Sequence, residues 1–377
     1  MNLVESKRIW LSSPHMGGTE QSFVKSAFDT NWVAPLGPNV DGFEEDIQQY
    51  LQSGTSVAAL SSGTAALHLG LKLLGVTRGD EVLCQSMTFS ASANPIVYLG
   101  ATPVFIDSES QTWNMCPEQL EIAIKDRISK GKKPKAIVAV HLYGMPYQVE
   151  AIHKIALTYE IPVLEDSAEA LGSSHNDIKC GTFGDIAILS FNGNKIITTS
   201  GGGALVSKTE KYKEKAIFLA TQSRDDAPHY EHSEIGFNYR MSNILAGIGR
   251  GQMQVLDQHV QKRRNNFKFY KEHLQELPDI KFLEEPNGFY SNRWLSCIET
   301  TSYELRETIR TALGKENIES RPLWKPMHRQ PVFEDCTMYL NGISDDLFDR
   351  GLCLPSGSNL EQEDLFRIVS VIKNVFT

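Results

Sequence analysis

The sequence predicts an α/β protein: a large domain with a mainly parallel mixed sheet flanked by helices, followed by a smaller α+β domain. Two observations support this prediction. Short apolar runs alternate with helical segments between residues 57 and 205, and beyond residue 252 the pattern becomes more polar and turn-rich. Alternating strands and helices are typical of parallel sheets with right-handed crossovers. At 377 residues the chain has room for two domains, which we expect at residues 1–251 and 252–377.

The apolar runs of the first part have the length of strands. Most are apolar on both faces, which is typical of strands in a sheet covered by helices. The runs are residues 56–62, 80–89, 102–107, 135–144, 161–166, 185–191 and 202–207. Between them, apolar residues recur at spacings of three and four, which predicts helices. The helical segments are residues 63–76, 90–100, 117–129 and 146–160. Such sheets bind ligands at the carboxyl ends of their strands, so we expect the site there.

The second part begins with a long polar helix over residues 255–277. A turn-rich stretch follows at 284–294, then a strand-like run at 294–300 and a helix at 303–316. We expect the domain boundary at or near the first of these helices. The sequence contains no internal repeat of solenoid length and no low-complexity stretch.

The composition is that of an ordinary globular protein, with 41% hydrophobic and 22% charged residues. The 37 basic and 46 acidic side chains give a net charge of −9, which argues against nucleic acid or an anionic membrane as the main partner. Six scattered cysteines without a C-x-x-C pair suggest neither a disulfide framework nor a thiolate zinc site. Residues 1–13 lack a signal-peptide core and no apolar run is long enough to span a membrane, so we expect a cytoplasmic protein.

A first candidate site is Ser62-Gly63-Thr64, between an apolar strand and an amphipathic helix. A strand end, a small turn and a helix N-terminus present unpaired N–H groups to an anion, and phosphate is the natural occupant. Taken alone, the segment favours the simpler interpretation that Ser62 or Thr64 merely caps the helix. It is not a nucleotide P-loop, because Lys-Ser/Thr does not follow the glycine at the required spacing.

Two further candidates follow other strands. Asp166 ends an apolar run, where a buried carboxylate needs a partner: a helix N-terminus, an arginine, or a ring nitrogen that must stay protonated. Lys195 lies between a strand and a triple glycine, a setting in which a desolvated lysine can form a Schiff base, although a surface lysine in a loop is the simpler interpretation. An anion site, a strand-end Asp and a sequestered Lys together match the phosphate, ring nitrogen and aldehyde of pyridoxal phosphate.

Five segments resemble the DegT/StrS-type nucleotide-sugar aminotransferases, and the resemblance covers nearly the whole chain. They are SSGTAAL, EDSAEALG, SFNGNKIITTSGGGALV, GFNYRMSNILAGIG and RPLWKPMHRQPVF. The segments LSSPHMGG, NWVAPLGPNV and SFNGNK are most similar to enzymes that aminate a UDP-4-keto-6-deoxy-N-acetylhexosamine, as in bacillosamine synthesis. The resemblance implies an aspartate aminotransferase-like fold (fold type I) and pyridoxal 5′-phosphate as cofactor.

The resemblance also implies roles for individual residues. Lys195 would bind the cofactor aldehyde and then move a proton between the substrate and the cofactor. Asp166 would hold the proton on the ring nitrogen, and Phe89 would stack on the ring. Glu169 stands where many relatives carry Gln or His near the ring hydroxyl, so its contact is open. The residues expected to hold the cofactor phosphate are Ser62, Gly63, Thr64 and Ser190, with Asn238 reaching the phosphate of the neighbouring subunit in a homodimer.

Sugar-nucleotide recognition is expected in the segment 320–330, which combines cations, donors and a stacking surface. The candidates are Arg321, Trp324, Lys325 and His328. A structured loop with its Trp packed into the domain junction is the alternative. Arg240 is a candidate for a donor carboxylate or a phosphate, and His141 and Tyr143 are expected to line the sugar site. His229 and His232 lack a third ligand, so no metal site is expected.

We therefore expect an enzyme that transfers an amino group from L-glutamate to C4 of a UDP-linked 4-keto-6-deoxy-N-acetylhexosamine for bacterial polysaccharide synthesis. The first alternative is a GDP- or dTDP-linked keto sugar, as in perosamine synthesis. A sugar dehydratase of the same scaffold carries His where Lys195 stands, which argues against that activity. A dehydrogenase would need G-x-G-x-x-G after its first strand, which SSGTAAL does not supply. A regulator that retains the cofactor without turnover is the last alternative.

Overall fold

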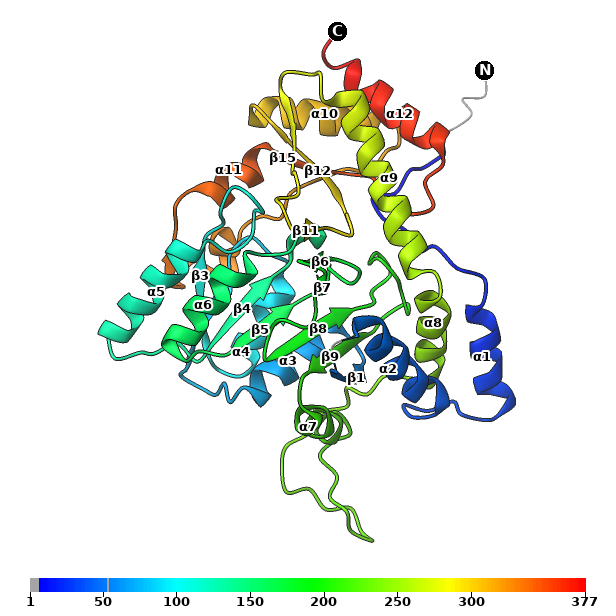
Figure 1. The fold of residues 1–377 in the computed structure, drawn as a ribbon, viewed down its shortest axis with the longest axis vertical. Coiled ribbons are helices and arrows are strands. Elements are labelled where there is room, and N and C mark those ends of the chain that lie inside the picture. Colours follow the sequence, from blue (N-terminus) through cyan, green and yellow to red (C-terminus); the bar gives the residue numbers. More distant parts are fainter. Residues whose placement is uncertain (1–6, 53) are drawn as a thin grey trace.

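The computed structural model describes residues 7–52 and 54–377. A mixed eight-stranded sheet forms the centre of the molecule (Figure 1), with strand order β1-β9-β8-β5-β4-β2-β3-β14. Its strands are β1 (Ser56–Leu60), β2 (Glu81–Gln85), β3 (Thr102–Ile106), β4 (Ala136–Val140), β5 (Val163–Asp166), β8 (Ile186–Ser190), β9 (Gly203–Ser207) and β14 (Met338–Tyr339). The first seven in chain order are the strands predicted from the sequence.

Within the described residues, β9 alone runs against the other strands of this sheet. It pairs antiparallel with β1 and with β8, whereas β8, β5, β4, β2, β3 and β14 pair in parallel. The predicted mainly parallel mixed sheet is confirmed. Because β1, β2, β4, β5 and β8 point the same way, their carboxyl ends meet at one edge of the sheet, and the amino end of β9 lies at the same edge.

Helices cover both faces of the sheet. The helices α3 (Gly63–Leu73), α4 (Asn94–Tyr98) and α7 (Glu210–Ala220) pack on one face, where their apolar residues form a single buried cluster with alternate strand residues. The opposite face carries α2 (Pro38–Leu51), α8 (Asn243–Met253), α5 (Pro117–Ser129) and α6 (Val149–Tyr159). The helix α1 (Glu20–Asp29) lies beside α8 at the edge of the molecule (Figure 1).

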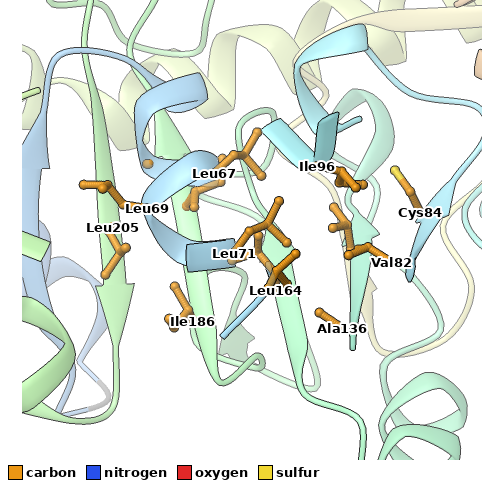
Figure 2. Packing of buried hydrophobic residues seen from close by; sticks show 14 of the residues in the cluster. Leu67, Leu69, Leu71, Val82, Cys84, Ile96, Ala136, Leu164, Ile186 and Leu205 are labelled. Carbon is orange, nitrogen blue, oxygen red and sulfur yellow. The ribbon is translucent and has the colours of Figure 1, made fainter. Parts of the chain in front are cut away.

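The helix α3 shows how the sequence places the site. Leu67 and Leu71 lie on its buried face and pack among strand residues such as Leu164 and Ile186 (Figure 2). Each buried leucine contributes roughly 1.5–3 kcal/mol. A Cβ added to Gly70 would lie 2.7 Å from a methyl carbon of Leu164, so the helix rests directly on the sheet. This packing fixes the N-terminus of α3 at the carboxyl end of β1.

A second, antiparallel sheet has the order β10-β12-β15-β13. Its strands are β10 (Ile280–Phe282), β12 (Ser296–Thr300), β13 (Arg321–Pro322) and β15 (Gly351–Leu354). The helices α9 (Leu256–Leu274), α10 (Tyr303–Lys315) and α12 (Gln362–Lys373) share a buried apolar cluster with it, and α11 (Ile343–Arg350) precedes β15. The remaining elements are the three-stranded sheet of β6 (Ser174–His175), β7 (Ile178–Lys179) and β11 (Phe289–Tyr290), and the short helices η1 (Ser90–Ser92), η2 (Leu142–Gly144), η3 (Met327–Arg329) and η4 (Pro331–Phe333).

The two main sheets are connected by α8 and α9, and the boundary expected after residue 251 falls in the last turn of α8. The C-terminal part also returns to the large sheet, because β14 pairs with β3. None of the helices among the described residues is both long and apolar enough to cross a membrane. The same residues contain no group of three His, Cys, Asp or Glu side chains that could hold a metal ion.

Candidate active site

A cavity of about 270 Å³ lies at the carboxyl ends of β1, β2, β5 and β8. Nine residues singled out from the sequence line it, although they come from segments as far apart as residues 62 and 324. They are Ser62, Gly63, Thr64, Phe89, Asp166, Glu169, Ser190, Lys195 and Trp324. The topology of the sheet brings these segments together, because all but the last follow its strands at one edge.

One end of the pocket is the N-terminus of α3. The Ser62 hydroxyl caps this helix by accepting a hydrogen bond from the Ala65 N–H at 3.0 Å. The N–H groups of Gly63 and Thr64 have no hydrogen-bond partner among the described residues, and neither do the Thr64 and Ser190 hydroxyls. Free N–H groups at a helix N-terminus, with two hydroxyls beside them, form a binding site for an anion such as phosphate.

Two glycines allow this end of the pocket to form. A Cβ on Gly203, the first residue of β9, would lie 2.4 Å from the Gly63 nitrogen. A Cβ on Gly63 would lie 2.9 Å from the Cβ of Ser190. Strand β9 and the start of α3 therefore approach more closely than any larger residue allows. Within the glycine run after Lys195, Gly203 is thus required by packing.

Asp166 lies at the floor of the pocket and is 3% exposed. Its Oδ2 accepts a hydrogen bond from the Ser92 hydroxyl at 2.6 Å, and its Oδ1 accepts one from the Ala168 N–H at 3.1 Å. Burial raises the pKa of Asp166 above its ordinary value, and these two hydrogen bonds and the Lys195 charge only partly oppose the effect. The carboxylate is therefore suited to a cationic partner inside the pocket.

Glu169 faces the same cavity from the turn after β5. Its Oε2 accepts a hydrogen bond from the Tyr143 N–H at 2.6 Å, and Tyr143 has a left-handed backbone conformation with φ 54°. Its Oε1 lies 3.6 Å from Lys195 Nζ. Burial raises the pKa of Glu169, while the Lys195 ammonium and the Tyr143 N–H lower it.

Lys195 projects into the pocket between an acid and an aromatic ring. Its side chain is 12% exposed, and its Nζ lies 4.1 Å from the centre of the Trp294 ring. Both this contact and the 3.6 Å approach to Glu169 are attractive contacts for the ammonium group of a lysine. The amine must lose that proton before it can act as a nucleophile.

The backbone around Lys195 is held by three distant segments. The Ser12 hydroxyl and the Trp294 indole N–H each donate to the Asn194 carbonyl at 2.7 Å. Arg263 of α9 donates to the Trp294 carbonyl at 2.6 Å and to the Ser12 hydroxyl at 3.0 Å. Arg263 is 1% exposed and has no carboxylate partner in the described chain; its two terminal nitrogens donate to this backbone and to Ser12, while its Nε has no partner among the described residues. We call these residues (Ser12, Arg263 and Trp294) the lysine clamp.

His141 and Tyr143, expected to line the sugar site, lie beneath the pocket wall instead. His141 is fully buried, bonds to Glu165 Oε1 at 2.8 Å and stacks on the Tyr147 ring at 4.5 Å. The Tyr143 hydroxyl accepts from the Trp324 N–H at 2.7 Å. Tyr143 therefore supports two pocket residues, Glu169 and Trp324, from behind, and His141 belongs to the core.

Arg240 and Asn238 lie outside this pocket. Arg240 forms an ion pair with Glu44 and donates to the Ala59 carbonyl at 2.8 Å, so its guanidinium is engaged within the chain. Asn238 is exposed and pairs with Thr221 through an isolated bridge.

The segment around Trp324 places one residue on the pocket and three away from it. The Trp324 ring lies 5.8 Å from Phe89 and 5.7 Å from Tyr143. Arg321 pairs with Glu319 at 2.9 Å and is 63% exposed. Lys325 is partly buried and does not line the cavity.

His328 joins two elements behind the pocket. Its Nδ1 lies 2.7 Å from the Ser86 hydroxyl after β2, and its Nε2 lies 3.2 Å from Asp345 in α11. Both ring nitrogens are therefore used within the fold, and the side chain is only 9% exposed.

Several lining residues were not assigned from the sequence. Ser92 orients Asp166, Trp294 stacks on Lys195, and Thr88 hydrogen-bonds to Ser92 at 2.8 Å. Ser92 and Thr88 flank Phe89 in the same MTFSASAN segment, so their small polar side chains after a strand are the signal that could have found them. Trp294 carries no local signal, because it reaches the pocket from the second part of the chain.

The pocket fits pyridoxal phosphate at three points. The free N–H groups of Gly63 and Thr64 suit its phosphate, the buried Asp166 carboxylate suits its protonated ring nitrogen, and Lys195 suits its aldehyde. The exposed ring of Phe89, 54% accessible, lies where a flat ligand ring can cover it.

The chain matches the model of the DegT/DnrJ/EryC1/StrS aminotransferase family over residues 14–373. EpsN of Bacillus subtilis (strain 168), assigned as a pyridoxal phosphate-dependent aminotransferase, is 50% identical over 374 residues, which cover 98% of this chain and 96% of EpsN. GDP-perosamine synthase of Escherichia coli O157:H7 is 36% identical over 373 residues, which cover 98% of this chain and 99% of that enzyme. The PMP form of Spr1654 from Streptococcus pneumoniae, assigned as a sugar aminotransferase, superposes with a TM-score of 0.91 and 26% identity over 98% of both chains. The pocket and these similarities lead to one conclusion: the chain belongs to the DegT/DnrJ/EryC1/StrS family and is a pyridoxal phosphate-dependent sugar aminotransferase.

Proposed function

We propose that this enzyme transfers the amino group of L-glutamate to C4 of a UDP-linked 4-keto-6-deoxy-N-acetylhexosamine, giving a 4-amino sugar for bacterial glycan synthesis. The observation that carries the transfer itself is the convergence of Lys195, Asp166 and the α3 N-terminus on one pocket. The UDP sugar is supported by the N-terminal segments at residues 11–18 and 31–40, which resemble enzymes of the bacillosamine type.

Each group of pocket residues has a separate role in the proposed reaction. Gly63, Thr64 and Ser190 would bind the phosphate, and Asp166 would keep the proton on the ring nitrogen. The bound cofactor supplies an electron sink for the bond that is broken at the substrate carbon. Lys195 Nζ would carry the proton between the substrate carbon that bears the amino group and the carbon of the cofactor. Trp324 and Phe89 form one aromatic side of the pocket.

Lys195→Ala tests the central role. We expect the variant to retain pyridoxal phosphate without covalent attachment and to lose turnover, because the nucleophile and the base are removed together. Borohydride reduction of the wild-type protein followed by peptide mass mapping should place the adduct on Lys195. An adduct on another residue would contradict the assignment.

The sugar is tested with a panel. The enzyme is incubated with glutamate and UDP-, GDP- or dTDP-linked 4-keto-6-deoxy sugars, and the configuration of each product is determined by NMR. We expect efficient turnover of the UDP sugar only. Equal turnover of the three nucleotides would refute the UDP assignment.

A GDP-linked keto sugar is the second candidate. It is favoured by one observation: the similarity to GDP-perosamine synthase extends over 98% of this chain. Preferential turnover of the GDP-linked 4-keto-6-deoxyhexose in the same panel would establish this candidate in place of the first.

We also propose that the enzyme works as a homodimer in which Asn238 reaches the phosphate site of the partner subunit. Asn238 is exposed and lies outside the pocket of its own chain. The segment between α7 and α8 that leads to it extends away from the body of the molecule (Figure 1). Sedimentation should show a dimer, and Asn238→Ala should weaken cofactor retention without removing any residue from its own pocket.

A further inference from the structure

The charges that face the pocket are two acids and one base. Asp166 and Glu169 are both buried, and Lys195 is the cation that lines the cavity with them in the described chain. The protonated ring nitrogen of a bound cofactor would be the partner of Asp166, which leaves Glu169 and Lys195 as a pair. Their nearest atoms, Oε1 and Nζ, lie 3.6 Å apart.

This pairing raises a problem for the first chemical step. Lysine is an ammonium at neutral pH, and the Glu169 carboxylate and the face of the Trp294 ring both contact that cation. An ammonium has no lone pair and cannot attack an aldehyde. Because the Lys195 side chain is only 12% exposed, its proton is removed most directly by a group already inside the pocket.

We propose that Glu169 is the proton acceptor for Lys195. One Nζ–H bond of the ammonium breaks and one Oε1–H bond forms, which converts an ion pair into a neutral amine and a neutral carboxylic acid. The two atoms need to close from 3.6 Å to a hydrogen-bond distance of about 2.6–3.2 Å, as groups in cofactor-free sites commonly do. The inference concerns cofactor attachment, so it does not depend on which sugar the enzyme uses.

The surroundings of Glu169 suit a carboxyl that takes up a proton. The titratable groups that act on it are Lys195, Asp166, the Tyr143 hydroxyl and the Cys297 thiol. Of these, Asp166 disfavours a second negative charge, and burial raises the pKa of Glu169 as well. The Tyr143 N–H occupies Oε2 at 2.6 Å, which leaves Oε1 directed at Lys195.

Glu169→Gln tests the proposal. Gln keeps the size of the side chain and an oxygen for the Tyr143 N–H, but it cannot accept the proton. Pyridoxal phosphate is mixed with cofactor-free protein, and the visible absorbance of the lysine-bound cofactor is followed by stopped flow between pH 6 and 9. We expect attachment at pH 7 to slow about 100-fold and to recover steeply with rising pH, as solvent takes over the deprotonation.

Two further variants separate chemistry from structure. Glu169→Asp retains a carboxyl and should restore most of the rate with the pH dependence of the wild type. Glu150→Gln is the matched control, because Glu150 pairs with His175 at 2.7 Å away from the pocket, and its attachment rate should be unchanged. All variants are compared for folding by circular dichroism and thermal unfolding.

Two results would overturn the proposal. One is a folded Glu169→Gln variant that attaches the cofactor at the wild-type rate with the wild-type pH profile. The other is a folded variant that fails to attach it at every pH, which would make Glu169 a residue of position rather than of proton transfer. Neither result affects the sugar assignment, which is read from the product.

Discussion

Glu165 and Asp166 are neighbours on β5, yet they serve opposite purposes. Both are buried, and they point to opposite faces of the sheet. The Glu165 carboxylate accepts hydrogen bonds from His141, Ser167 and the N–H groups of residues 181, 183 and 184. Asp166 accepts from Ser92 and Ala168. Five donors therefore surround the carboxylate of Glu165, and two surround that of Asp166.

The pKa values follow this difference. Burial alone would raise the pKa of Glu165, but the bonds from His141 and from the 181–184 turn outweigh it and hold the pKa below its ordinary value. For Asp166 burial dominates, and its pKa is raised. The comparison shows that the structural carboxylate, Glu165, has enough hydrogen-bond donors to stabilise its charge. The carboxylate that faces a ligand, Asp166, has too few.

The largest effect is expected from Glu165→Ala. It leaves His141 and three buried N–H groups without their acceptor, so the free energy of unfolding should fall by about 3–5 kcal/mol. Urea unfolding of the cofactor-free protein at pH 7 measures it. Asp166→Ala is the comparison and should lose far less. Equal losses for the two variants would break the distinction between these acids.

The sequence predicted the strands better than the contacts between them. The seven strands of the first part were found because most of them are apolar on both faces. Helix α1 was not assigned, since only Glu20 and Ala27 of its ten residues are buried and its apolar pattern is weak. Strand β14 is two residues long and joins the sheet from the second part of the chain.

The candidate site shows the same limit. Asp166 and Lys195 could be chosen because Asp166 ends β5 and Lys195 lies in the turn after β8, where local pattern has meaning. The position of His141 could not be predicted from local pattern, because its partner Glu165 lies 24 residues away on the neighbouring strand. Arg263 and Trp294 hold the lysine backbone from more than 60 residues away, and no local pattern encodes such contacts.

The next effect concerns a buried group outside the pocket. His259 is 3% exposed, stacks on His15 at 4.8 Å, and its Nδ1 has no partner in the described residues. Burial lowers the pKa of His259 to about 4 from 6.5. The unfolded chain therefore takes up this proton first, and stability that is complete above pH 6.5 is lost as the pH falls toward 4.

The unfolding free energy lost through protonation of His259 should reach about 3 kcal/mol as the pH falls toward 4. Unfolding free energies of the wild type and His259→Phe, measured between pH 8 and pH 4, should converge toward alkaline pH and diverge in favour of the variant in acid. His229→Gln, at an exposed position, is the control. Parallel curves for wild type and His259→Phe would show that an unsatisfied buried group outside the pocket carries no such penalty.

A moderate effect is expected where β9 meets α3. Gly203→Ala places a Cβ 2.4 Å from the Gly63 nitrogen, so the helix start must shift, at a cost of about 1–3 kcal/mol in unfolding free energy. The same shift should weaken cofactor retention, because the free N–H groups move. Gly314→Ala in α10 is the matched control, since its Cβ meets nothing within 4 Å and should stabilise the helix by about 0.5–1 kcal/mol. Unchanged cofactor retention in Gly203→Ala would show that the close packing of β9 on α3 is not needed for the anion site.

Asp166→Asn is expected to change stability least, and it is the most direct test of the contrast between Glu165 and Asp166. Asn at position 166 keeps an oxygen for the Ala168 N–H, and its NH₂ group can donate to Ser92, whose hydroxyl rotates to accept. Only the buried charge is removed. Asp166→Asn should therefore raise the unfolding free energy of the cofactor-free protein by about 1 kcal/mol at pH 7, while transamination falls by at least about 100-fold.

The pH dependence of that gain fixes its cause. The pKa of Asp166 is raised above 3.8 in the folded chain, so the charge burdens the folded state at neutral pH, and the burden fades as the pH falls through the folded pKa toward 3.8. The advantage of Asp166→Asn should shrink over the same range and vanish near pH 4. A variant less stable than the wild type at pH 7 would mean that the two hydrogen bonds to Asp166 already satisfy its charge, and the contrast with Glu165 would then be one of degree rather than of purpose.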